Sequence, residues 1–138
     1  METVADLMTR NPLTATPDTS LFDVLEIMRT TEVRQLPIVL DNRLVGIVTD
    51  RDLRLAMTSP LVLHERKYDE KMLHETPVES CMTPDPISVT PDTPAYKAAE
   101  TLSAYKFGAL PVVEGEILVG IVSVTDFLRH YARAHTPR

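Results

Sequence analysis

Apolar residues follow two different periods along the chain, and the same succession of periods occurs twice. A helical spacing, with an apolar residue at every third or fourth position, follows each copy of the sequence Thr-Pro-Asp-Thr. These stripes consist of Leu21, Val24, Leu25 and Met28 in the first copy and of Ala95, Ala98, Ala99 and Leu102 in the second. Two apolar runs joined by a short polar turn then predict a β-hairpin in each copy. The pattern therefore predicts an α+β fold with two units of the order β-α-β-β-α.

Turn and capping residues set the expected bounds of these elements. Short strands are expected at Leu13–Thr16 and Ile87–Thr90, just before the two helices. Thr19 and Thr93 are placed to cap the helices, with Pro94 at a first helical position, where its missing N–H costs nothing. The hairpin strands are expected at Leu36–Leu40 and Leu44–Val48 in the first copy, and at Leu110–Val113 and Ile117–Val122 in the second. A last helix is expected to begin near Asp50 in one copy and near Val124 in the other.

The chain is an internal duplication. A shift of 74 residues aligns Met8–Arg54 with Met82–Leu128 without a gap, and 17 of the 47 aligned positions are identical. This predicts one domain at 1–58, a linker at 59–75 and a second domain at 76–138. Because about fifty residues build only a marginal core alone, the two copies are expected to share one core. Several apolar linker residues predict that part of the linker packs: Leu61, Val62, Leu63, Tyr68, Met72 and Leu73.

Composition excludes several classes of protein. The net charge of −6 provides no basic footprint for nucleic acid. No run approaches the roughly 20 apolar residues of a membrane helix, and the first ten residues lack the apolar stretch of a signal peptide. With a single cysteine, Cys81, no intrachain disulfide is possible. We therefore expect a cytoplasmic protein that binds neither nucleic acid nor a membrane.

The sequence offers no catalytic constellation. The four histidines, at positions 64, 74, 130 and 135, lack the spacing of a metal site and are expected at the surface. Four glycines are too few for a glycine-rich phosphate loop, and no Ser-His-Asp arrangement is evident. Cys81 aligns with Leu7 and is expected to pack as a small apolar residue. We expect no enzyme, no bound metal and no catalytic cofactor.

Four short motifs recur in the same order in both copies. They are Met-Thr with a nearby proline, Thr-Pro-Asp-Thr, Leu-Pro before Ile-Val or Val-Val, and Gly-Ile-Val followed by Thr or Ser and, three residues later, Asp. Together they resemble the CBS domain, named after cystathionine β-synthase, and the pair resembles a Bateman module. The resemblance covers nearly the whole chain. It implies two β-α-β-β-α repeats, which we expect to be related by a pseudo-twofold axis.

The resemblance also implies a function. Paired CBS domains are regulatory and bind adenosyl ligands, such as AMP, ADP or ATP and sometimes S-adenosylmethionine or a dinucleotide, in clefts between the repeats. By this resemblance Asp52 and Asp126 would accept hydrogen bonds from ribose hydroxyls, and Thr49 and Ser123 would bond to ribose or phosphate. The residues implied against adenine are Thr14, Ala15, Thr16, Leu36 and Pro37 for one cleft, and Ser88, Val89, Thr90, Leu110 and Pro111 for the other. In relatives each cleft commonly combines the Asp of one repeat with the adenine-lining strand of the other.

These residues also have purely structural interpretations. Thr49 with Asp52, and Ser123 with Asp126, have the spacing of a helix capping box, and one pair can cap and bind at once. Arg34 and Arg51 are either phosphate contacts or solvated surface residues. Their counterparts in the second copy are Gly108 and Thr125, so positive charge for a phosphate is unequally distributed.

Two hypotheses about function follow. The first is a sensor that binds an adenine nucleotide and signals its occupancy to a regulated partner or a paired subunit. The alternative is a dimerisation or interaction module without a physiological nucleotide, or one that binds S-adenosylmethionine or a dinucleotide. A homodimer through helices is expected from the resemblance, and Phe127, Leu128 and Tyr131 form either part of such a surface or part of the internal packing.

Overall fold

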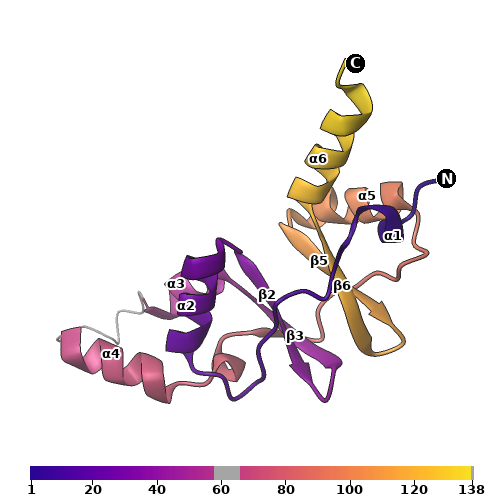
Figure 1. Cartoon of the computed structure of the whole chain (residues 1–138). Helices are drawn as coiled ribbons and strands as arrows, with labels where there is room; N and C mark the ends of the chain where they lie inside the picture. Colours follow the sequence, from indigo (N-terminus) through magenta and orange to yellow (C-terminus); the bar gives the residue numbers. More distant parts are fainter. Residues whose placement is uncertain (58–65, 138) are drawn as a thin grey trace. The chain divides into compact units, whose positions relative to one another are not determined.

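Two separate units are visible in the computed structural model, which describes residues 1–57 and 66–137. One unit, called here the continuous unit, is Leu13–Pro86. The other, called here the split unit, combines Met1–Pro12 with Ile87–Arg138. Each unit contains a hairpin with two helices packed against it (Figure 1). The α+β class predicted from the sequence is confirmed.

The continuous unit is built on the hairpin β2–β3. Its elements are α2 (Leu21–Thr31), β2 (Gln35–Leu40), β3 (Arg43–Thr49), α3 (Asp50–Met57), α4 (Arg66–Glu75), a 3-10 turn (Val78–Ser80) and β4 (Thr83–Pro84). Strands β2 and β3 are antiparallel, with Gln35 opposite Thr49, and β4 adds a short antiparallel pairing to β3. Helices α2 and α3 contact each other as well as the hairpin.

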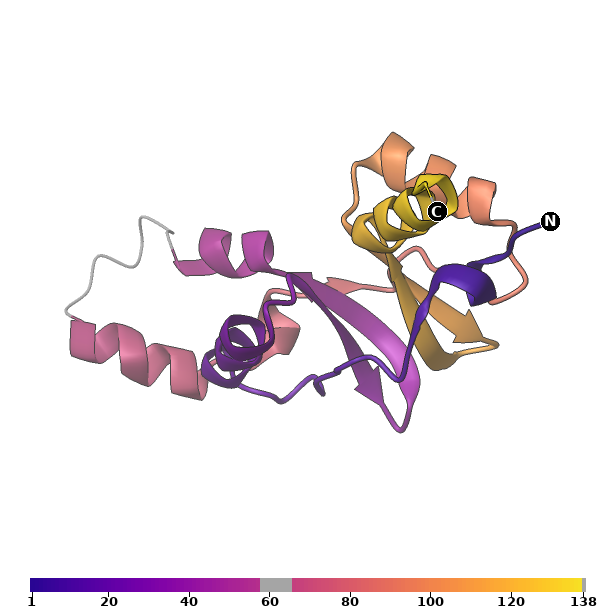
Figure 2. The ribbon, with the colours of Figure 1, turned by 45° about the horizontal axis from the view of Figure 1, so that its top comes forward.

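The split unit repeats this arrangement. Its elements are α1 (Val4–Leu7), β1 (Thr9–Arg10), α5 (Ala95–Tyr105), β5 (Ala109–Glu114), β6 (Ile117–Ser123) and α6 (Val124–His135). Strand β1 pairs with β6, and α1 contacts both α5 and α6 (Figure 2). The predicted hairpin strands are confirmed in both units to within one residue at each end, and the last helices begin at Asp50 and Val124 as predicted.

Two local predictions were wrong. The expected strands Leu13–Thr16 and Ile87–Thr90 are reduced to single parallel bridges, from Ala15 to Ile38 and from Val89 to Val112. The proline after Thr16 and after Thr90 turns the chain away, because proline has no N–H to continue a ladder.

The helix caps also differ from the prediction. Ser20 and Pro94, not Thr19 and Thr93, are the N-cap residues, and the Ser20 side chain accepts a hydrogen bond from Asp23 N at 3.1 Å. The hydroxyl of Thr19 instead accepts from Thr16 N at 3.0 Å, which closes the preceding turn. Thr93 does the same for Thr90. Each threonine therefore stabilises the turn before the helix, and the helix begins one residue later than expected.

Each unit contains a segment that the sequence alignment assigns to the other repeat. Met8 leads the first repeat but packs against Gly120 in the split unit, and Met82 leads the second repeat but packs against Gly46 in the continuous unit. The sequence repeats and the compact units therefore have different boundaries. The predicted domains 1–58 and 76–138 describe the duplication, whereas the units exchange their leading segments.

The buried apolar side chains form two clusters, one in each unit. The continuous unit buries Ala15, Leu21, Val24, Met28, Leu36, Ile38, Val48, Leu53 and Val78. The split unit buries Val4, Ala98, Leu102, Leu110, Val112 and Val122. Val78 and Val4 come from the exchanged segments and are fully buried. A segment from the other sequence repeat thus completes the buried cluster of each unit.

The predicted packing of the linker is confirmed for one of its residues. Leu73 on α4 packs against the core of the continuous unit, and the ring of His74 stacks on Phe22 of α2 with centroids 4.0 Å apart. Leu61, Val62 and Leu63 lie outside the residues that the structure describes, as does the side chain of Tyr68.

The contact between methionine and glycine makes alanine costly at both glycines, and more costly at position 120. A Cβ at Gly120 would lie 2.9 Å from the backbone oxygen of Thr9, which cannot move without disturbing β1. A Cβ at Gly46 would meet the Met82 side chain, which can change rotamer. We expect Gly120→Ala to lower the free energy of unfolding by about 1–3 kcal/mol and Gly46→Ala by less, as measured by urea denaturation. The reverse order would contradict this account of the packing.

Candidate ligand-binding residues

A reciprocal hydrogen-bonded cap begins the helix that follows the hairpin in each unit, α3 in the continuous unit and α6 in the split unit. Thr49 N donates to Asp52 Oδ2 at 2.9 Å, while Asp52 N donates to Thr49 Oγ1 at 3.1 Å. Ser123 and Asp126 form the same pair of bonds at the same distances. All four residues are half-buried. Since the cap uses Oδ2 of each carboxylate and a carboxylate has about four lone-pair sites, Oδ1 can still accept from a ribose hydroxyl.

The residue before each hairpin is held against this helix start. Asp50 N donates to the backbone oxygen of Arg34 at 2.9 Å, and Val124 N donates to that of Gly108 at 3.0 Å. Arg34 and Arg51 therefore flank the start of α3, and both are exposed. The predicted inequality of charge is visible in the structure, because Gly108 and Thr125 occupy the equivalent places at the start of α6.

The segments predicted to contact adenine are also brought together within each unit. Ala15 N donates to Pro37 O at 3.1 Å, and Val39 N donates to Ala15 O at 2.9 Å. Val89 makes the same bonds with Pro111 and Val113, at 3.0 and 2.8 Å. These bonds place Thr14–Thr16 beside Leu36–Pro37, and Ser88–Thr90 beside Leu110–Pro111.

The predicted residues thus form two groups in each unit. In the continuous unit, β2 has Ala15 along one edge and β3 along the other, so β2 separates the adenine group from the cap at Thr49. The side chains of Leu36 and Leu110 are fully buried in the two cores. In these groups, Thr16, Ser88 and Thr90 are exposed and Thr14 is half-buried. The hydroxyls of Thr16 and Thr90 donate to Asp18 and Asp92.

Cys81 lies near the first cap without being part of it. Its half-buried side chain packs against the core of the continuous unit, as expected for a small apolar residue. Burial raises the pKa of the Cys81 thiol, and the negative charge of Asp52 raises that pKa further. Cys81 therefore remains a protonated thiol at neutral pH, unsuited to nucleophilic chemistry.

A hollow of about 550 Å³ in the continuous unit was not predicted from the sequence. It is lined by Leu25, Met28, Arg29, Glu32, Val33, Arg34, Asp50 and Arg54. Of these residues only Arg34 was predicted to contact a ligand. The lining comes from α2, from the start of α3 and from the turn before β2, which a search for short motifs does not connect. The available signal was the helical spacing of Leu25, Met28, Arg29 and Glu32 along one face of α2.

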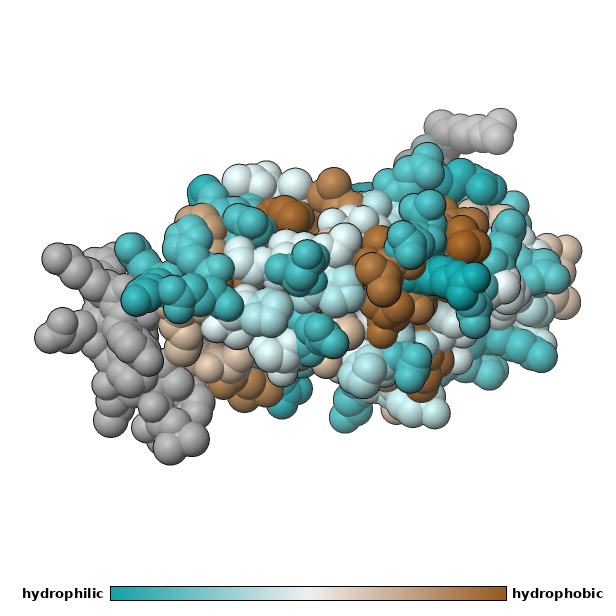
Figure 3. Space-filling model, turned by 90° about the horizontal axis from the view of Figure 1, so that it is seen from below, coloured by the Kyte–Doolittle hydropathy of each residue, from teal (hydrophilic) through white to brown (hydrophobic). Residues whose placement is uncertain are grey.

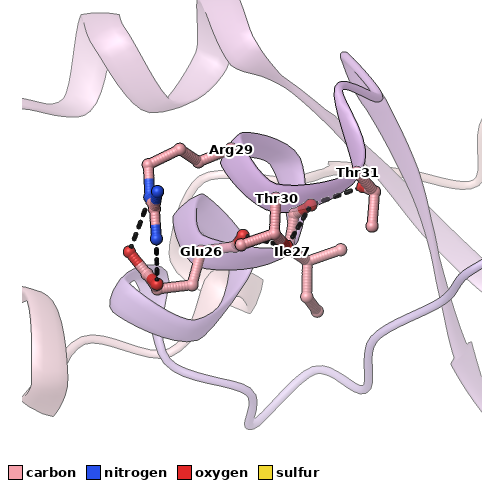
Figure 4. A network of polar contacts seen from close by, with 5 residues as sticks. All are labelled: Glu26, Ile27, Arg29, Thr30 and Thr31. Atoms are coloured by element: carbon pink, nitrogen blue, oxygen red, sulfur yellow. Dashed lines mark hydrogen bonds and ion pairs between the residues drawn. The ribbon is translucent and has the colours of Figure 1, made fainter.

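Side-chain contacts order the part of α2 that borders this hollow (Figure 4). The guanidinium of Arg29 donates to both carboxylate oxygens of Glu26, at 2.9 and 3.2 Å. This hydrogen bond and the attraction between the charges lower the pKa of Glu26 and raise that of Arg29. Thr30 and Thr31 donate to the backbone oxygens of Glu26 and Ile27 in the preceding turn. At the other side of the hollow, the guanidinium nitrogen Nη2 of Arg54 lies 3.8 Å from Oδ2 of Asp50.

Histidine and acidic residues do not gather into metal sites in the part of the chain that the structure describes. His130 Nε2 lies against a carboxylate oxygen of Glu2, and His135 stacks on Tyr131 with ring centroids 4.1 Å apart. His64 lies outside the described residues. Within residues 1–57 and 66–137, every helix is too short or too polar to cross a bilayer.

Comparison with known proteins gives one consistent result. The family model for the CBS domain matches residues 4–59 and 78–133. A CBS domain-containing protein of Dictyostelium discoideum is 34% identical over 129 residues, which cover 91% of this chain and 88% of that protein.

Two solved structures add ligands to this comparison. One is the structure of CBSX2 in complex with AMP, and CBSX2 comes from Arabidopsis thaliana. Its sequence is 34% identical to this chain and the TM-score is 0.82. The match covers 97% of this chain and 98% of the other. The CBS domain pair of protein MJ0100, solved with 5′-methylthioadenosine and S-adenosyl-L-methionine, is 26% identical with a TM-score of 0.81. That match covers 97% of this chain and 98% of the other.

Proposed function

Because the chain belongs to the CBS-domain family, we propose that it is a regulatory module that binds an adenosyl ligand of the AMP, ADP or ATP class. Its occupancy would be signalled to a regulated partner or to a paired subunit. Signalling of this kind requires a ligand with different affinities for two conformations of the protein. The proposed role is binding and not catalysis.

The main support for this proposal is the helix cap that occurs in both units, at Thr49 with Asp52 and at Ser123 with Asp126. A hydroxyl residue and an aspartate, three residues apart and half-buried, begin both α3 and α6 with the same hydrogen bonds. A carboxylate can accept both hydroxyls of a ribose, and the N–H groups of a helix start favour an anion such as phosphate. Similarity to a structure solved with AMP and to one solved with S-adenosylmethionine and methylthioadenosine supports the adenosyl class.

The proposed roles of individual residues follow from this arrangement. Asp52 and Asp126 would bind ribose hydroxyls, and Thr49 and Ser123 ribose or phosphate. Arg34 and Arg51 would attract phosphate at the continuous unit alone. The backbone around Ala15 and Val89 would receive the purine, with the buried leucines and prolines beside them as support.

We further propose that the module forms a homodimer through its helices. Helix α6 favours this because Leu128 and Tyr131 are each 65% exposed, whereas Phe127 packs against the core of the split unit. Large apolar residues exposed along one helix are typical of an interaction surface.

Thermal unfolding with a panel of adenosyl ligands tests the proposed binding. At 100 times the dissociation constant, a ligand should stabilise the native state by about 2.7 kcal/mol. For a chain of this size, that corresponds to a rise in Tm of about 10 °C. The panel is adenosine, AMP, ADP, ATP, S-adenosylmethionine and a dinucleotide, with GMP as a control. If no member shifts Tm at millimolar concentration, the module is better explained as a dimerisation domain without a nucleotide.

A further inference from the structure

The two units differ in one helix. Helix α4 packs against α2 in the continuous unit (Figure 1). Helix α5 is the counterpart of α2, because the 74-residue offset brings Leu21–Thr31 onto Ala95–Tyr105. The same offset makes Met1 the counterpart of Glu75, the last residue of α4. Among the residues that the structure describes, the split unit therefore contains no counterpart of α4.

The backbone that follows α4 has the same contacts in both units. Leu21 N donates to Thr76 O at 2.9 Å, and Ala95 N donates to Glu2 O at the same distance. The next residue of each leading segment then forms an isolated bridge to the residue before the helix. Helices α1 and α6, which do contact α5, correspond to the 3-10 turn and to α3. The place beside α5 that corresponds to α4 is therefore not filled by the described residues.

The side of α2 that faces α4 is less exposed than the same side of α5. Phe22 is half-buried, and the ring of His74 stacks on it with centroids 4.0 Å apart. The counterpart of Phe22 is Tyr96, which is 52% exposed. Glu26 is half-buried, whereas its counterpart Glu100 is exposed. Hydrophobic patches alternate with hydrophilic ones on the molecular surface (Figure 3), and an aromatic residue within a polar rim is typical of protein interfaces.

The charge on this side of α5 is also less compensated. In the continuous unit, the guanidinium of Arg29 donates to both carboxylate oxygens of Glu26. The counterpart of Arg29 is Ser103, which cannot neutralise the carboxylate of Glu100. Tyr96 and Glu100 are four residues apart and lie on one face of α5. An aromatic ring next to a carboxylate attracts a cation, which can lie over the ring and pair with the acid.

We propose that the face of α5 formed by Tyr96, Glu100 and Ser103, called here the α5 face, binds an amphipathic helix of another protein in the way that α2 binds α4. The helix would place a histidine or an aromatic residue on Tyr96 and a lysine or arginine beside Glu100. The net charge of −6 on the chain favours such a basic helix. The proposal goes beyond the proposed function, because no adenosyl ligand takes part in this contact.

A second copy of the chain is a less favourable occupant. It could offer its own α4 only by removing that helix from α2. Leu73 already packs there against the core of the continuous unit, and His74 already stacks on Phe22. A helix from a different protein binds without the loss of these contacts.

Fluorescence anisotropy tests the proposed docking. The probe is a fluorescein-labelled peptide with the sequence of residues 66–77, closed by a lactam bridge because a free peptide of this length is barely helical. It should bind the wild-type chain. Tyr96→Ala should weaken binding by about tenfold or more, as for a central aromatic residue of an interface. Glu100→Lys should weaken it by about threefold or more, since the peptide carries Arg66, Lys67 and Lys71.

Tyr105→Ala is the matched control. Tyr105 is 58% exposed on the same helix, but it lies about two and a half turns from Tyr96 and therefore on the opposite side. This variant should bind the peptide as the wild type does. Absence of binding to the wild-type chain, or equal binding by the wild type and Tyr96→Ala, overturns the proposal. A loss caused by Phe22→Ala and not by Tyr96→Ala would mean that the peptide replaces α4 on α2, which also overturns it.

Sedimentation equilibrium separates a foreign helix from a second copy. Tyr96→Ala should leave any self-association of the chain unchanged. If the substitution weakens self-association, a second copy occupies the α5 face and the proposal is wrong. Circular dichroism checks that each variant is folded. Because all these measurements are made without nucleotide, their failure leaves the adenosyl binding read from Tm unaffected.

Discussion

Asp52→Ala is expected to weaken the binding of AMP or ATP more than Asp126→Ala does, by about tenfold or more. Both substitutions would remove one proposed ribose contact, but Arg34 and Arg51 flank the cap at Asp52, whereas Gly108 and Thr125 stand at the equivalent places near Asp126. A charge-assisted contact to phosphate contributes roughly 1.5–3 kcal/mol, which corresponds to at least a tenfold difference in affinity. The net charge of −6 opposes an anion elsewhere, so these local cations matter more. Isothermal titration of both variants with AMP, ATP and adenosine measures the difference.

The two aspartates provide their own matched control. Each caps a helix with the same bonds at the same distances, so both alanine variants should lose a similar stability, about 1 kcal/mol. If the two variants differ in ligand affinity but not in free energy of unfolding, the difference in affinity is due to the ligand site and not to the lost helix cap. Arg51→Ala should weaken binding of ATP or AMP more than that of adenosine. Equal losses from the two aspartate variants, or a larger loss from Asp126→Ala, would show that the assignment is wrong.

Leu36→Ala is expected to lower the free energy of unfolding by about 2–5 kcal/mol. Leu36 is fully buried in the core of the continuous unit, where a smaller residue leaves a cavity. Leu40 stands on the same strand and is 53% exposed, so Leu40→Ala should change stability by less than about 0.5 kcal/mol. Urea denaturation of the two variants tests this contrast. Similar losses from both would mean that β2 is stabilised by something other than the core.

The elements that the sequence predicted well are those whose pattern is local. Each hairpin combines two apolar runs with a short polar turn, and its two strands are adjacent in the sequence and pair with each other. The pattern of a short segment is therefore enough to predict it. The stripe of α2 was also predicted correctly, since Leu21, Val24 and Met28 are buried. The caps failed because Thr19 and Ser20 are adjacent residues that can both cap, and only the turn made by Thr16 decides between them.

The remaining features depend on contacts between distant segments. The 74-residue offset aligns Met8 with Met82, but the alignment does not show which unit each methionine packs against. The exchange of leading segments could therefore not be predicted from the duplication. The hollow was missed for a related reason, because α2 and α3, which line it, are separated in the sequence by the hairpin β2–β3. For the site, the caps at Thr49 and Ser123 were predicted from spacing alone. Their roles toward a ligand came from resemblance and stay predictions.

The exchanged segments make the two units unequal during folding. The continuous unit is a single stretch, residues 13–86, that lies between the two pieces of the split unit, so it is topologically an insertion within it. Bringing Val4 to Ala98 and Leu102 requires closing a loop that spans those 74 residues (86 − 13 + 1), which costs about 4 kcal/mol of chain entropy when the loop is unfolded. If the continuous unit folds first, it shortens that loop before the split unit has to close it. We therefore expect residues 13–86 to fold first and the N-terminal and C-terminal segments of the split unit to join last.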